Sequence, residues 1–98
     1  MKLRLTRRAQ RHLDSIAEYL SERNPDAARQ AGERLRETIN LLRAFPRIGH
    51  AGALAGTSEF LVAGLPYVIV HRIEADNDTL VILGVYHGRQ LRPGQQIR

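Results

Sequence analysis

Two amphipathic helical stripes, separated by a single Asn-Pro step, constrain the fold of this chain more than any other feature of its sequence. Apolar residues recur at helical spacing on both sides of Asn24-Pro25. The stripes are Ala9, Leu13, Ile16, Ala17 and Leu20, then Ala28, Ala31, Leu35, Ile39 and Leu42. Asn24 is a good N-cap, and Pro25 suits the first position of a helix. So short a break predicts an antiparallel helical hairpin.

Strand-like segments flank this hairpin. Lys2 to Thr6 alternates polar and apolar residues, as a short half-buried strand does, and Thr6 can then cap the first helix. Phe45-Pro46 ends the second helix, because the residue before proline is disfavoured in helical geometry. Three further runs are strand-like: Ser58–Ala63, Tyr67–Glu74 and Thr79–His87. Their short connections carry turn residues and predict an antiparallel meander.

The predicted fold class is therefore α+β, in the order β-αα-βββ, with an antiparallel sheet packed on an N-terminal helical hairpin. Ninety-eight residues are enough for one domain, which we expect to span residues 1–98. The chain has no cysteine, so disulfides and thiolate metal sites are excluded. No apolar run is long enough for a signal peptide or a membrane span, and we expect a cytoplasmic protein.

Net charge is +5, which suggests an anionic partner, either a nucleic acid or an acidic protein. The excess of base is uneven: residues 1–56 carry 11 basic and 6 acidic side chains, and residues 57–98 carry four of each. A well-solvated arginine-rich surface is the alternative reading of the same charge.

Both faces of the last two strands look apolar, although a helical hairpin can cover only one of them. If the strands alternate regularly, one face carries Val68, Val70, Arg72, Val81, Leu83 and Val85. This face is a candidate partner surface, because large exposed apolar patches are unusual in monomers. Cover by loops and the C-terminal tail is the alternative. Arg72 could receive an acidic partner or pair with Glu74 or Glu59 across strands.

Four features in this order resemble the RelE/ParE toxin superfamily over residues 3–89. They are the Asn-Pro break between the helices, the Phe45-Pro46-Arg47-Ile48-Gly49 turn, the Tyr67-Val68-Ile69-Val70 strand and the closing run from Ile82 to Arg89. The resemblance implies a toxin whose curved sheet packs on a helical hairpin and which a cognate antitoxin silences. RelE-like members cut messenger RNA on the ribosome, whereas ParE-like members inhibit DNA gyrase.

Side chains favour the ParE-like branch. RelE-like nucleases use lysine, arginine and tyrosine, some of them on the loop before the first strand of the meander. Here residues 52–57 of that loop have no basic residue, and Val68 stands where the RelE pattern has an arginine. A nuclease variant that uses glutamate and histidine is harder to set aside, because His87 could occupy its histidine position. We expect no catalytic residues, no cofactor and no metal site.

The leading hypothesis is thus a toxin of a type II toxin–antitoxin system that inhibits DNA gyrase by protein–protein contact. A RelE-like ribosome-dependent endoribonuclease and a non-toxic antitoxin-binding module are the alternatives. The candidate target contacts are Tyr86, His87, Arg89 and Arg92, which combine aromatic, histidine and arginine side chains beyond the last strand. The antitoxin is expected to be small and acidic, with an amphipathic C-terminal segment laid on Val68, Val70, Arg72, Val81, Leu83 and Val85. No membrane and no sequence-specific nucleic-acid partner is expected.

Overall fold

A computed structural model describes residues 1–95 of the chain. Its elements are β1 (Lys2–Leu5), α1 (Arg7–Arg23), α2 (Pro25–Ala44), β2 (His50–Ala51), β3 (Ser58–Leu61), β4 (Tyr67–Glu74), a 3-10 turn η1 (Ala75–Asn77) and β5 (Thr79–His87). The predicted order of strand, two helices and three strands is confirmed. The additional element is β2, whose two residues are too few to produce a sequence pattern.

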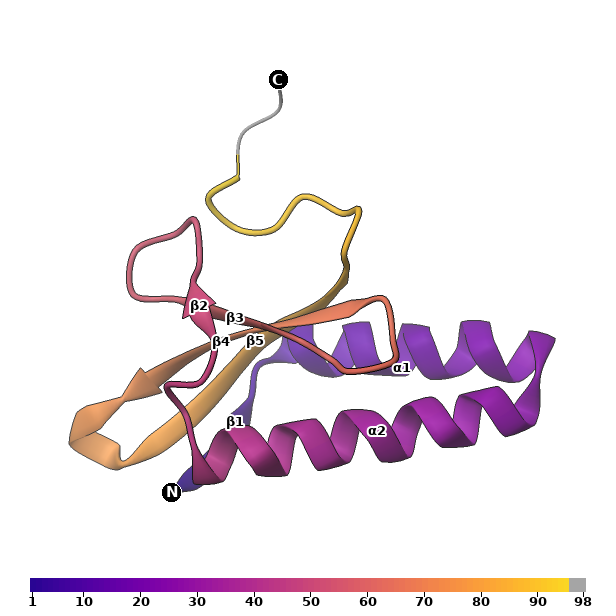
Figure 1. Ribbon diagram of the computed structural model, residues 1–98, viewed down its shortest axis with the longest axis horizontal. Coiled ribbons are helices and arrows are strands. Elements are labelled where there is room, and N and C mark those ends of the chain that lie inside the picture. The colour runs from indigo at the N-terminus through magenta and orange to yellow at the C-terminus, as the bar shows by residue number, and fades with distance from the viewer. Residues whose placement is uncertain (96–98) are drawn as a thin grey trace.

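The ends of both helices follow the capping chemistry of the sequence. The Thr6 side chain accepts a hydrogen bond from the backbone N–H of Ala9 at the start of α1. The Asn24 side chain accepts from the amides of Asp26 and Ala27, which fixes the start of α2 one residue after α1 ends. Figure 1 shows the two helices as an antiparallel pair lying along the sheet.

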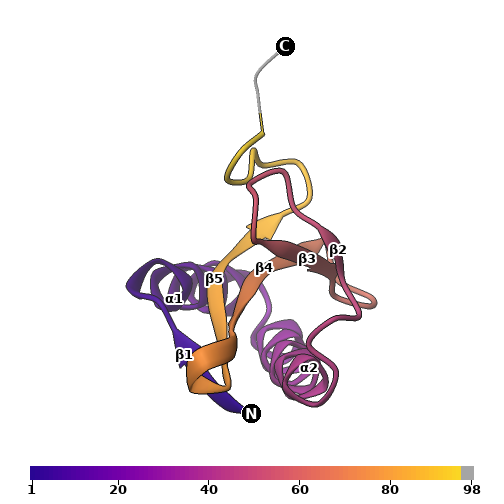
Figure 2. The same ribbon diagram turned by 90° about the vertical axis from the view of Figure 1, so that its left-hand side faces the viewer.

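The sheet is mixed, whereas an antiparallel sheet was predicted. Its strand order is β1-β5-β4-β3-β2, and β1 pairs with β5 in parallel, with Leu3 opposite Leu80. All other neighbouring strands are antiparallel. The N-terminal strand therefore lies at the opposite edge of the sheet from β2. Figure 2 shows β1 at one side of the sheet and β2 at the other.

The core lies between the sheet and the hairpin. It joins one side chain of α1, three of α2 and the helix-facing residues of β4 and β5, together with Val62: Ala9, Leu35, Ile39, Leu42, Val62, Tyr67, Ile69, Leu80, Ile82 and Val85. On the side of the sheet away from α2, the loop after β2 and the segment after β5 extend next to each other (Figures 1 and 2). Within residues 1–95, no helix combines the length and apolar character needed to cross a membrane.

Candidate functional site

A bulge in β5 changes which side chains share a face. Val70 pairs with Gly84 and His71 pairs with Ile82, so Leu83 is an extra residue with no partner of its own. Beyond it the alternation reverses. Val85, opposite Ile69, faces the helices and is 3% exposed in the core. The prediction that Val81, Leu83 and Val85 share one face is therefore wrong, because the extra residue shifts the two-residue period by one.

The other predicted contacts of that face are largely covered. Val68, Val70 and Val81 are 7%, 1% and 0% exposed. Val81 lies between Arg4 of β1 and Arg72 of β4 in the sheet register. Arg72 pairs with Glu74 at 3.0 Å, one of the two alternatives that the sequence left open. The candidate antitoxin surface is thus no open apolar patch in this fold.

Glu74, at the end of β4, is surrounded by positively charged side chains. The Asn77 side-chain amide donates to it, and Arg4 and Arg72 both form ion pairs with it. The Asn77 hydrogen bond and then the two guanidinium charges hold the pKa of Glu74 below its ordinary value. Arg72 is therefore already paired within the sheet, which leaves it less available to a partner carboxylate.

The four candidate target contacts do not gather on one surface. Tyr86 lies against Gly84 on the outer face, where a Cβ on Gly84 would come within 2.6 Å of its ring. His87 pairs with Tyr67 and faces the helices, with the two rings edge to face at 6.1 Å. Only Arg89 is a fully exposed arginine of this set. Arg92 is directed back onto the protein.

The contacts of Arg92 are made within the chain. Its Nε donates to the Glu59 carboxylate at 2.8 Å, and its side chain is 15% exposed. One terminal nitrogen donates to the carbonyls of Gly88 and Gln90. A residue predicted to touch a target is thus anchored to β3. No local sequence pattern predicts this pairing, because 33 residues separate Glu59 from Arg92.

His12 of α1 has a structural role. β1 ends at Leu5 opposite Ile82, so the edge of β5 beyond that point has no strand partner. There the His12 Nδ1 accepts the Val85 backbone N–H at 3.1 Å. Burial, followed by the charges of Arg8 and Arg11, lowers the pKa of His12, which favours the neutral imidazole that this bond requires.

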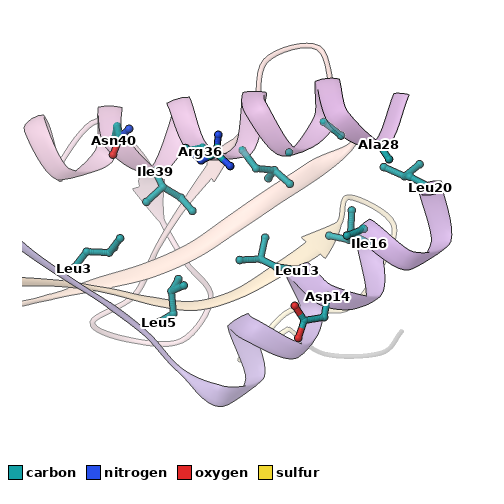
Figure 3. A pocket seen from close by; sticks show the side chains of 14 residues that line it. Leu3, Leu5, Leu13, Asp14, Ile16, Leu20, Ala28, Arg36, Ile39 and Asn40 are labelled. Carbon is teal, nitrogen blue, oxygen red and sulfur yellow. The ribbon is translucent and has the colours of Figure 1, made fainter. Parts of the chain in front are cut away.

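An apolar groove lies between the two helices, where no site was predicted. It is a groove of about 410 Å³, lined by α1, α2 and the side chains of Leu3 and Leu5 on β1. Figure 3 shows Leu13 and Ile16 of α1 on one side of the groove and Ile39 and Ala28 of α2 on the other. Ala17, Ala28, Ala31 and Gly32 line it as well. Small residues on both facing stripes were the signal for this opening, because they leave a gap where larger side chains would close the hairpin.

No metal centre is formed by the described residues: no three His, Asp or Glu side chains converge among residues 1–95. His50 approaches Glu59 at 3.7 Å, but Arg92 already occupies that carboxylate. His71 is completely buried on the helix-facing side of β4.

The sequence between residues 3 and 92 matches the family described as "ParE toxin of type II toxin-antitoxin system, parDE". The chain belongs to the ParE toxin family. Its resemblance to the RelE/ParE superfamily is thereby confirmed, together with the branch that the side chains favoured.

Relatives of this ParE-family chain agree. It is 36% identical over 92 residues to the candidate toxin Y4kP of Sinorhizobium fredii, a match that covers 94% of this chain and 93% of Y4kP. A solved structure of the chromosomal ParDE system of P. aeruginosa is similar with a TM-score of 0.78 at 22% identity, covering 89% of this chain and 95% of that one. The intact E. coli RelBE toxin–antitoxin complex follows at 0.64 and 12% identity, covering 91% and 98%. The ParE-family chain therefore has the fold that the superfamily resemblance implied.

Proposed function

We propose that this ParE-family toxin inhibits DNA gyrase by protein–protein contact, without catalysis of its own, and that a cognate antitoxin neutralises it in the cytoplasm. The family match over residues 3–92 carries this proposal. The contact surface is the segment that follows β5, where Arg89 and Leu91 are exposed. Arginine beside an exposed apolar side chain is a combination enriched in protein interfaces.

The loop between β2 and β3 argues against the ribonuclease alternative. Cleavage of RNA needs cationic groups to stabilise the phosphorane and a group to activate the 2′-hydroxyl. Residues 52–57 carry neither charge nor imidazole. Glu59, the carboxylate nearest to this loop in sequence, is 4% exposed and paired with Arg92, so it is poorly placed to act as a base.

Two assays in parallel test the activity. The purified toxin is expected to block supercoiling by DNA gyrase and to leave translation of a messenger RNA intact. Adding its antitoxin should restore supercoiling. Site-specific cleavage of ribosome-bound messenger RNA, with supercoiling unaffected, would instead assign the chain to the RelE-like activity.

For the antitoxin, the groove between α1 and α2 is a better site than the covered sheet face. Most of its lining is apolar, and it borders β1, whose outer edge has no strand partner among residues 1–95. An amphipathic antitoxin segment can bury its apolar side in the groove, and an extended portion can pair with the β1 edge. Arg36 lines the groove and offers a cation to an acidic partner. Solved toxin–antitoxin complexes with this fold are consistent with such a partner.

Gly32 allows a clean test of the groove. A Cβ at Gly32 would meet no atom within 4 Å, so a larger side chain extends into open space. Gly32→Trp should fill the groove and weaken antitoxin binding by at least about tenfold, roughly the effect of one lost contact of 1.4 kcal/mol. Gly32→Ala is the matched control and should bind normally, with a helix more stable by up to about 1 kcal/mol. Normal antitoxin affinity of the tryptophan variant, measured by calorimetry, would place the antitoxin elsewhere.

A further inference from the structure

The segment after β5 is a folded loop fixed by its own side chains. Gln90 Oε1 accepts the His87 backbone N–H at 2.7 Å, while the Gln90 N–H donates to the His87 carbonyl. Gln95 and Arg92 repeat the same reciprocal arrangement at 2.7 and 3.0 Å. The Gly88 amide donates to the Pro66 carbonyl of the turn before β4. Residues 87–95 therefore form two closed turns, called here the terminal loop.

One ion pair joins the terminal loop to the sheet. The Glu59 carboxylate is 4% exposed on β3 and accepts from Arg92 Nε. One terminal nitrogen of Arg92 donates to the carbonyls of Gly88 and Gln90. A single guanidinium thus links β3 to the backbone on both sides of Arg89. An ion pair at such low exposure is far less screened by salt than a surface pair.

The terminal loop also packs against the loop between β2 and β3. A Cβ on Gly94 would lie 2.5 Å from the Leu54 backbone nitrogen and 2.7 Å from the Ala53 carbonyl carbon. Gly94 has a φ of +85°, which disfavours any other residue there. Two independent contacts therefore hold the terminal loop in place: the Arg92–Glu59 ion pair and the close approach of Gly94 to the backbone of the loop between β2 and β3.

We propose that Arg92 and Glu59 form a clamp that positions Arg89, Gln90 and Leu91 as a preformed contact for the toxin's target. The proposal rests on the proposed function, since it assigns to this loop the contact that stops growth. Arg92 is then a positioning residue and does not itself meet the target. A preformed loop binds more tightly than a free tail, because the entropy of ordering it is lost on folding and not on binding.

The clamp is tested with matched charge variants. Glu59→Gln and Arg92→Gln each break the ion pair. Arg29→Gln removes one exposed arginine, which pairs with Asp26 on α2 and lies outside the terminal loop. Amide hydrogen exchange should accelerate about tenfold or more at Arg92 and Gln95 in the first two variants, in line with the loss of a charged hydrogen bond. The Val85 amide, outside the loop, should keep its protection in all three.

Function is measured by growth arrest and by gyrase inhibition. Both clamp variants should need about tenfold more toxin for either effect, whereas Arg29→Gln behaves as wild type and antitoxin affinity is unchanged. The double variant Glu59→Arg with Arg92→Glu restores an opposite-charge pair and should recover part of the activity. Arg92→Lys keeps the charge but cannot bridge Glu59 and both carbonyls, so it should be intermediate.

Gly94→Ala provides a second route that spares the β3 carboxylate, in case Glu59→Gln fails to fold. It should loosen the same amides and reduce potency in the same way. Variants with a loosened loop and full potency would overturn the clamp, as would an unchanged exchange rate. A wild-type toxin that arrests growth but leaves gyrase active would refute the gyrase assignment alone, and potency in growth arrest would still decide on the clamp.

Discussion

The two ring nitrogens of His71 are buried without a hydrogen-bond partner among residues 1–95. Burial lowers the pKa of His71; the backbone carbonyls of Ile69 and Pro46 oppose this only in part, and neither makes a bond of good geometry with the ring. His12, whose Nδ1 holds the Val85 amide, also has a lowered pKa, with burial as the main cause. Both histidines therefore prefer the neutral form in the folded protein.

Acid should consequently destabilise the fold. The unfolded chain binds protons at its histidines near a pKa of about 6.5, and the folded chain binds them only at lower pH. The contribution of these two histidines to the free energy of unfolding is therefore present in full above the unfolded pKa of about 6.5, and it is lost as the pH falls below that value. His71→Leu should flatten this dependence, because it removes the buried imidazole whose pKa burial lowers. Urea denaturation between pH 5 and 8 measures it; an equally steep curve for His71→Leu would contradict the assignment.

Gly84 of β5 leaves room for the ring of Tyr86. A Cβ there would press on the Tyr86 ring, which is also edge to face with His12 at 4.8 Å. Gly84→Ala should therefore cost about 1–3 kcal/mol of unfolding free energy, the usual effect of overpacking. Gly32→Ala, with open space around it, should have the opposite sign. A Gly84→Ala protein as stable as the wild type in urea would show that Tyr86 moves aside freely.

Among the secondary-structure elements, both helices were predictable from the sequence. For β5, the strand itself was predictable but the faces of its side chains were not. The helical spacing of apolar residues, the Thr6 cap and the Asn24-Pro25 step are all local features of the sequence, and they are enough to specify both helices. The strand runs were also found, but their faces depend on a strict period of two. The bulge at Leu83 arises from how β5 pairs with β4, which no local pattern contains. The Arg92–Glu59 pair was missed for the same reason, because it is a tertiary contact.

The bulge makes a direct prediction about two neighbouring apolar residues. Val85 lies in the core at 3% exposure, whereas Leu83, the extra residue, is partly exposed. Val85→Ser should lower the unfolding free energy by about 2–3 kcal/mol, and Leu83→Ser by about 1 kcal/mol or less. Regular alternation would give the two substitutions equal effects. Chemical denaturation of both variants therefore tests which face each side chain occupies.

At the level of the whole molecule, an antitoxin bound in the apolar groove should gain most of its binding free energy from apolar burial. A segment buried in the groove gains roughly 25 cal/mol per Å² of apolar surface, and an exposed ion pair at its rim adds only about 0–1 kcal/mol. The complex should therefore survive 1 M sodium chloride, with slower association and nearly unchanged dissociation. Binding kinetics across a salt series measure both rates. Release of free toxin at 1 M salt would mean that charge holds the pair together.

The parallel pairing of β1 with β5 has a consequence for synthesis of the chain. Lys2 through Leu5 find their partners only at residues 79–82, so the first strand to be translated must wait for the last. A ribosome adding about 5–20 residues per second needs several seconds to reach them. Leu3 and Leu5 line the groove between the helices, which is therefore incomplete until residues 79–82 have been made and have paired with β1. If the antitoxin binds there, a toxin chain that is still shorter than this offers it no complete binding site.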